Sequence, residues 1–166
     1  MINYFVTENF IKTRTQVSQN VDFDDIAPNI RVAAIDYIRP ILGKEFFDDL
    51  LEKYNNQTLN SDEEELVEII QMIVAYRAVD ATIPFVTFRI SNKGVSALNG
   101  EFSTSEGLNV INYLRNELKQ AASTKEDELK NFLKLRADDF PIYKSKTNKE
   151  IVEPQDPYDE TGFDII

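Results

Sequence analysis

The feature that most constrains the fold is a long apolar segment that follows a helix-start signal. Ser61-Asp62-Glu63-Glu64 has the pattern of a capping box, in which the Ser61 oxygen and the Glu64 carboxylate each bond the other's backbone N–H. A helix that is apolar on most sides is normally buried. The sequence therefore predicts that the central helix of the domain begins here and is interrupted by Pro84. Its apolar residues are Leu66, Val67, Ile69, Ile70, Met72, Ile73, Val74, Tyr76 and Val79.

Helical spacing also precedes this segment. Aspartates crowd a helix start at Asp22, where the helix dipole favours negative charge, and Pro28 is expected in the first turn. The helix is expected to be punctuated at Pro40 and Gly43 and followed by a second short one. The apolar face of that second helix contains Phe46, Phe47, Leu50, Leu51 and Tyr54.

A further long helix is predicted after the central one. Ser103-Thr104-Ser105-Glu106 is another capping box, and apolar residues at helical spacing follow it as far as Leu135. A pause is expected at Ser123-Thr124. The predicted fold is therefore mainly α, a small bundle of about four helices.

Two turn signals lie between the central helix and this last helix. They are Asn92-Lys93-Gly94 and Asn99-Gly100, and the stretch before them, 85–90, is typical of either a helix end or a strand. A short β-hairpin is therefore predicted within residues 86–104. It is either a simple connector or an edge that pairs with another copy of the chain. The candidate inter-subunit residues are Asn92, Lys93, Gly94, Asn99 and Gly100.

The composition changes at the C-terminal end. Residues 150–166 contain the acids Glu150, Glu153, Asp156, Asp159, Glu160 and Asp164 and no Lys or Arg. Prolines from Pro141 onward argue against helix, yet the segment keeps more apolar residues than a disordered tail would. We therefore predict a helical domain over 1–139 and an extended acidic arm over 140–166 that orders on a partner, the alternative being a frayed terminus. The candidate partner-binding residues are Phe140, Pro141, Tyr143, Tyr158, Phe163, Ile165 and Ile166.

Composition excludes most familiar enzyme classes. The chain of 166 residues has no Cys and no His, which removes disulfides, thiolate metal sites, catalytic triads and the usual general base near neutral pH. It carries 29 acidic and 18 basic residues, a net charge of −11, and so is a poor sequence-independent binder of nucleic acid or of an anionic membrane. No apolar run approaches the roughly 18 residues needed to span a bilayer, and residues 1–10 lack the basic and then apolar pattern of a signal peptide. A soluble, non-enzymatic internal protein is expected, with no cofactor or metal.

Charged clusters have simple explanations. Asp22, Asp24 and Asp25 lack the glycine turn and distal glutamate of a calcium loop, and helix-start carboxylates account for them. The mildly basic stretch 125–149 is either a set of cations near a helix C-terminus or a docking stripe for an acidic neighbour.

Four segments resemble a known family. They are Asn20–Ile30, Ile41–Leu50 with its Leu-Gly break, the turn Ile90-Ser91-Asn92-Lys93-Gly94-Val95, and Phe140-Pro141-Ile142-Tyr143. Together they resemble the head–tail connector (adaptor) proteins of tailed bacteriophages, especially a group in phages of gut Bacteroidetes that includes crAss-like phages. The resemblance covers most of residues 1–143 and includes no catalytic signature.

The resemblance implies a structural virion protein. Connector subunits form rings, commonly of twelve copies, that dock beneath the portal protein and extend the channel through which DNA passes without specific binding. It implies a location in the neck of the virion, after synthesis in the bacterial host cytoplasm, with contacts to other neck or tail proteins. Assigning portal docking to residues 144–166 goes beyond the resemblance. The rival interpretations are another neck or tail protein (head completion or tail terminator) and a soluble acidic regulatory binding module.

Overall fold

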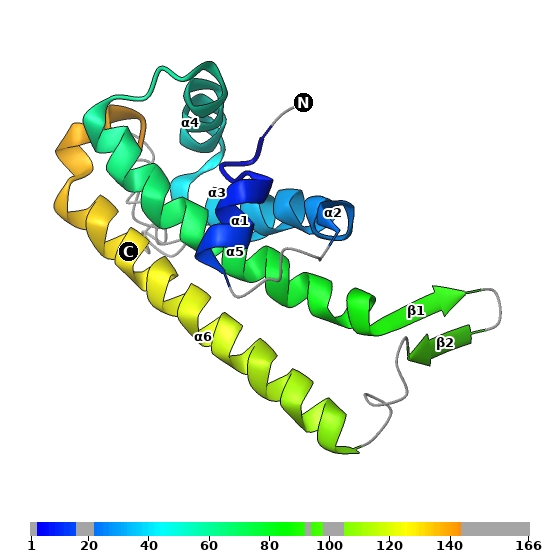
Figure 1. The fold of residues 1–166 in the computed structure, drawn as a ribbon. Coiled ribbons are helices and arrows are strands. Elements are labelled where there is room, and N and C mark those ends of the chain that lie inside the picture. The colour runs from blue at the N-terminus through cyan, green and yellow to red at the C-terminus, as the bar shows by residue number, and fades with distance from the viewer. Residues whose placement is uncertain (1–2, 16–21, 92–93, 98–104, 144–166) are drawn as a thin grey trace, which may run out of the picture.

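The structure, a computed structural model, describes residues 3–15, 22–91, 94–97 and 105–143, and it is mainly α-helical. Two long helices lie side by side, and shorter helices from the N-terminal third cover one end of the pair (Figure 1). The α-helices in chain order are α1 (Glu8–Arg14), α2 (Phe23–Ala33), α3 (Arg39–Leu42), α4 (Lys44–Asn56), α5 (Ser61–Thr87) and α6 (Ser105–Leu135). A π-helical segment, Ala34–Ile38, joins α2 to α3, and a 3-10 turn, Ala137–Asp139, follows α6.

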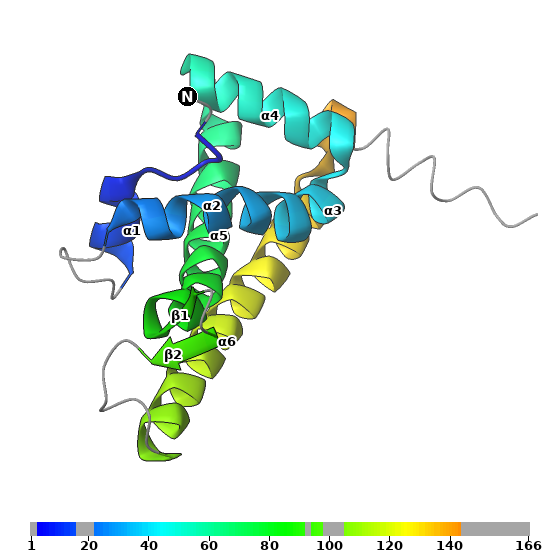
Figure 2. The ribbon, with the colours of Figure 1, turned by 90° about the vertical axis from the view of Figure 1, so that its right-hand side faces the viewer.

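Helix α5 is the central helix, as its apolar sequence predicts. It packs against α6 along its length and against α2 on another side, so both neighbours bury its apolar residues (Figure 2). Leu66, Ile70 and Ile73 are completely buried. By length and composition alone, Ser61–Val86 is also apolar enough to cross a membrane, contrary to the sequence-based expectation. The packing of α5 in the protein core accounts for that apolar character.

The start of α5 lies one residue earlier than the capping-box pattern indicates. The backbone N–H of Glu63 donates to Asn60 Oδ1 at 2.9 Å, and the Asn60 N–H donates to Glu63 Oε2 at 3.0 Å. The reciprocal pair is therefore Asn60 with Glu63, not Ser61 with Glu64. Glu63 is buried and also binds Lys53 Nζ at 2.7 Å, and this tertiary contact selects the register.

Two predicted interruptions are absent from the helices. Helix α5 continues through Pro84 to Thr87, and α6 continues through Ser123. A proline inside a helix costs about 3 kcal/mol through its lost N–H and its steric clash. Contacts just before Pro84 hold the helix: Asn29 Nδ2 donates to Thr82 Oγ1 at 2.9 Å.

The N-terminal helices begin and end largely where the sequence predicts. The Asp22 side chain caps α2 by accepting from the Asp24 N–H at 3.1 Å. Pro28 lies further inside α2 than the first turn. Gly43 separates α3 from α4 with φ 81° and ψ 157°, a conformation that is essentially restricted to glycine.

Two short strands follow α5. Strands β1 (Phe88–Ser91) and β2 (Gly94–Ala97) pair antiparallel, with Phe88 opposite Ala97 and Ser91 opposite Gly94. Both lie inside the range 86–104. Asn92, Lys93, Asn99 and Gly100 lie outside the described residues.

The packed domain extends past the predicted boundary at 139/140. Phe140 is 2% exposed, and its ring centroid lies 5.5 Å from that of Phe46 and 6.1 Å from that of Phe132. Tyr143 also contacts Phe46, with centroids 6.2 Å apart. Phe140 is thus a core residue of the domain, which differs from its predicted role as an anchor for a partner.

Candidate interaction site

The chain segment before α1 is fixed by contacts with α4 and α5. The Asn3 N–H donates to Asn55 Oδ1 at 2.9 Å, and Asn55 Nδ2 donates to the Asn3 carbonyl at 3.1 Å. Gln71 Nε2 on α5 donates to the Phe5 carbonyl at 2.8 Å. The buried Phe5 ring lies edge-on to Phe47, with centroids 5.6 Å apart. These contacts hold the neighbouring residues Tyr4 and Val6 in place beside α2.

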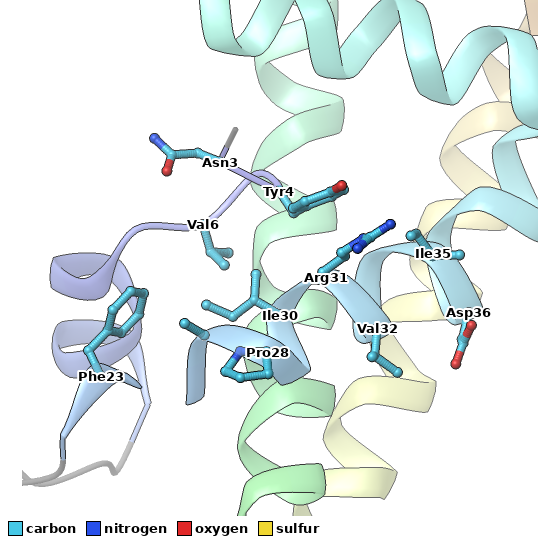
Figure 3. A pocket seen from close by; sticks show the side chains of 11 residues that line it. Asn3, Tyr4, Val6, Phe23, Pro28, Ile30, Arg31, Val32, Ile35 and Asp36 are labelled. Carbon is cyan, nitrogen blue, oxygen red and sulfur yellow. The ribbon is translucent and has the colours of Figure 1, made fainter. Parts of the chain in front are cut away.

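This segment and α2 together line a groove of about 580 Å³. Tyr4 and Val6 contribute from the N-terminal segment, and Phe23, Ile30 and Val32 contribute from α2 (Figure 3). The lining continues into the π-helical segment. We call this surface the α2 groove, and it is lined by Asn3, Tyr4, Val6, Phe23, Ala27, Pro28, Ile30, Arg31, Val32, Ile35 and Asp36.

The α2 groove is mostly apolar but contains a cation. Figure 3 shows the Arg31 guanidinium between the Tyr4 ring and Ile35, whereas Asp36 lies at the end of the groove. Arg31 is exposed and makes no ion pair within the part of the chain that the structure describes. An apolar surface with one available cation is suited to an apolar segment that carries a carboxylate.

A second apolar surface lies on α6, toward the end of the helix pair that α1–α4 leave uncovered (Figures 1 and 2). Val110 is 63% exposed, Tyr113 66% and Leu114 40%. Their spacing of three and four residues places them on one side of the helix. We call these three residues the α6 stripe. Phe85 and Val86, near the end of α5, are also exposed large apolar residues.

The sequence analysis did not identify either surface. The signal for the α6 stripe is present in the sequence, because α6 has apolar residues on two sides near its start. Ile111 and Leu118 are partly buried, whereas Val110 and Tyr113 are exposed, so one apolar face serves the core and the other does not. The α2 groove has no such signal, since its two walls are far apart in the sequence.

Most predicted contact residues lie outside the described part of the chain. This holds for Tyr158, Phe163, Ile165 and Ile166 of the arm and for four of the five turn residues. Gly94 starts β2. Pro141 and Tyr143 lie in the packed segment that follows α6, next to the buried Phe140.

Some basic residues of the stretch 125–149 form ion pairs inside the domain. Arg136 forms ion pairs with Asp62 and Glu65 at the start of α5 and with Asp139, the last at 2.9 Å. The hydrogen bond with Asp139 is the main cause of the raised pKa of Arg136. Lys130 pairs with Asp127 at 3.2 Å. These two residues therefore belong to intramolecular pairs, while Lys144, Lys146 and Lys149 lie outside the described residues.

The acidic groups at helix ends have structural roles. Asp22 caps α2, and Asp138 and Asp139 lie in the 3-10 turn after α6. Within the described ranges, no three acidic side chains gather in a way that would hold a metal ion.

Comparison with known proteins places part of this architecture in a family. A family of unknown function, DUF6712, matches residues 38–151, which is more than half of the chain. The chain belongs to DUF6712. No curated protein and no solved structure matches it. The DUF6712 match contains α4, α5 and α6, and therefore the α6 stripe, whereas the residues that line the α2 groove all precede position 38.

Proposed function

We propose that this DUF6712 protein is a structural subunit of a tailed-phage neck, a head–tail connector that forms a ring beneath the portal. In this role it binds copies of itself, the portal and other neck proteins, and it has no enzymatic activity. DNA passes through the ring without specific binding. The protein is made in the host cytoplasm and ends in the virion.

The observation that carries this proposal is the presence of two apolar surfaces on different elements of one small domain. The α2 groove and the α6 stripe are both open to solvent. A subunit with two different contact surfaces assembles head to tail, which closes into a ring when the rotation between copies permits. A single surface of one kind would instead favour a two-fold dimer.

Two further points support the connector role. The resemblance to connector proteins extends over segments that form much of the packed domain, including Ile41–Leu50 and Phe140–Tyr143. The net charge of −11 would also limit adhesion of DNA to a channel wall, because phosphate binding requires basic residues. The segment 144–166, which follows Tyr143 in the sequence and contains the acidic run 150–166, is the proposed contact with the portal.

The test is the native mass of the protein alone and mixed with the portal protein encoded by the same genome. We expect a portal-dependent ring of many copies, and its location in the neck in images of particles. A variant that ends at Tyr143 serves as the matched control. It should keep its helical circular dichroism, because it retains every helix that the structure describes, but should fail to join the portal.

Other outcomes separate the alternatives. A persistent monomer that is absent from purified particles would reject the connector role in favour of an acidic regulatory module. A ring found at the capsid opening or the tail end would assign the protein to head completion or tail termination.

A further inference from the structure

We propose that the α6 stripe of one copy docks in the α2 groove of the next copy, with Glu117 of the first facing Arg31 of the second. This inference deepens the proposed function by naming the contact between neighbouring subunits. It depends on the proposed function only for the location of the assembly in the phage neck.

The first argument is the match in surface chemistry. Tyr113 is the largest residue of the α6 stripe and is 66% exposed, between Val110 and Leu114 along one side of the helix. The α2 groove offers Tyr4, Val32 and Ile35 as its apolar walls. Moving the stripe into the groove would remove both apolar surfaces from water, which favours association.

The second argument is charge complementarity. Glu117 follows Tyr113 by four residues and Leu114 by three, so it lies on the same side of α6 as the stripe. It is exposed and forms no ion pair within the described ranges of the chain. Arg31 in the α2 groove is likewise exposed and forms no ion pair within those described ranges. Lys119, two residues after Glu117, points about 200° away around the helix and does not compete.

The third argument is that one molecule presents both surfaces at once. The α2 groove lies where the N-terminal segment meets α2, and the α6 stripe lies toward the opposite end of the helix pair (Figure 2). A copy bound through its stripe therefore still offers its groove. Each contact leaves one groove and one stripe available at the two ends, so the contact propagates until a ring closes.

The absence of cysteine from the natural chain permits a clean cross-linking test. A double variant, Val32→Cys with Val110→Cys, places one thiol in the groove and one beside Tyr113. Under mild oxidation of the assembled protein we expect a ladder of disulfide-linked dimers, trimers and larger species on denaturing gels. Each single variant should give dimers at most.

The matched control moves the second thiol to the other side of α6. Val32→Cys with Lys119→Cys should give no ladder. Lys119, like the residues of the α6 stripe, is exposed, so its thiol would be accessible to oxidation. A ladder from this control equal to that from the first pair would overturn the inference, because the contact would then not be specific to the stripe.

Charge reversal provides the second test. Arg31→Glu and Glu117→Arg should each weaken assembly by roughly tenfold in concentration, and the two together should restore it, as expected for a close interfacial pair. Lys119→Glu should leave assembly unchanged. Circular dichroism confirms that each exposed-site variant remains folded. Weakening without restoration in the double variant would count against the pairing.

The outcomes distinguish this inference from the proposed function. Rings that form with the portal but give no Val32–Val110 ladder would overturn the docking and leave the connector role in place. A ladder without portal binding would support the docking and overturn the connector role. A cross-link of Val32→Cys to Ile165→Cys in place of the ladder would show that the C-terminal segment occupies the groove, and would overturn the inference.

Discussion

Asp80 on α5 and Arg115 on α6 form an ion pair in which Arg115 Nε lies 2.8 Å from Asp80 Oδ1, and the Asp80 side chain is only 10% exposed. The pair joins the two long helices next to the α6 stripe, because Arg115 directly follows Leu114 in the sequence. A second link, Arg77 with Glu126 at 2.7 Å, lies further along the same interface. Two ion pairs at different points along the interface therefore fix how α5 and α6 lie against each other.

Removing the cation from the first pair should destabilise the domain. We expect Arg115→Met to lower the free energy of unfolding by about 2 kcal/mol, because it leaves a nearly buried carboxylate without its partner. Asp80→Asn in the same background should recover part of the loss. Urea unfolding of the four proteins in the cycle measures the coupling, and additive effects would contradict a direct interaction.

The helix cap at Asn60 gives a prediction with an adjacent control. Asn60→Ala should cost about 1 kcal/mol of stability, because the Glu63 N–H loses its acceptor. Ser61→Ala should have almost no effect, since the Ser61 side chain lies beyond the cap and is exposed. Thermal unfolding of the two variants decides between the observed cap and the one read from the sequence pattern; a larger loss for Ser61→Ala would favour the latter.

Lys53 predicts a pH dependence at alkaline pH. Its hydrogen bond with Asp49, and then that with Glu63, raise the pKa of Lys53 above its usual 10.5. A pKa that is higher in the folded than in the unfolded protein stabilises the fold fully below pH 10.5, and this contribution is lost as pH rises through the folded-state value.

Lys53→Met should therefore reduce stability at pH 7 to 9, with the difference from the natural protein shrinking above pH 10.5. Chemical unfolding between neutral and alkaline pH measures this difference. Lys44→Met is the control, because Lys44 and Asp48 are paired on the surface with side chains 70% and 52% exposed. Equal pH profiles for both variants would argue against a special role for Lys53.

Phe140 predicts where the domain can be shortened. A chain that ends at Tyr143 should unfold with nearly the natural free energy, whereas one that ends at Asp139 should lose about 3 kcal/mol or more, because the ring between Phe46 and Phe132 is removed. Phe140→Ala in the full chain should give a similar loss. Equal stability of the two shortened chains would contradict the core placement of Phe140.

Local sequence signals located several helix boundaries. The Asp22 cap and the Gly43 break both depend on one residue and its nearest neighbours, and both are confirmed. The apolar run of α5 likewise predicted a central buried helix. The mainly α fold follows from such signals, because helical hydrogen bonds and amphipathic spacing are set within a few residues.

The local patterns failed where distant residues decide the outcome. The choice of Asn60 as cap depends on Glu63, which Lys53 also binds. The path of α5 through Pro84 depends on neighbouring helices, and the burial of Phe140 depends on Phe46. In each case a tertiary contact outweighs a local preference of a few kcal/mol, which is a common result in compact domains.

The sequence by itself determined the mainly helical class, the central buried helix, and a composition without the side chains of familiar catalytic sites. Only the tertiary structure decided where the contact surfaces lie. The α2 groove exists because Asn55 and Gln71 bind the chain near Asn3 and Phe5, across more than fifty residues. The α6 stripe is exposed because α1–α4 cover only one end of the helix pair. The periodicity of α6 shows apolar residues on two sides of the helix, but only the packing decides which of those sides stays exposed. The α2 groove leaves no periodic signal, because its walls are far apart in the sequence.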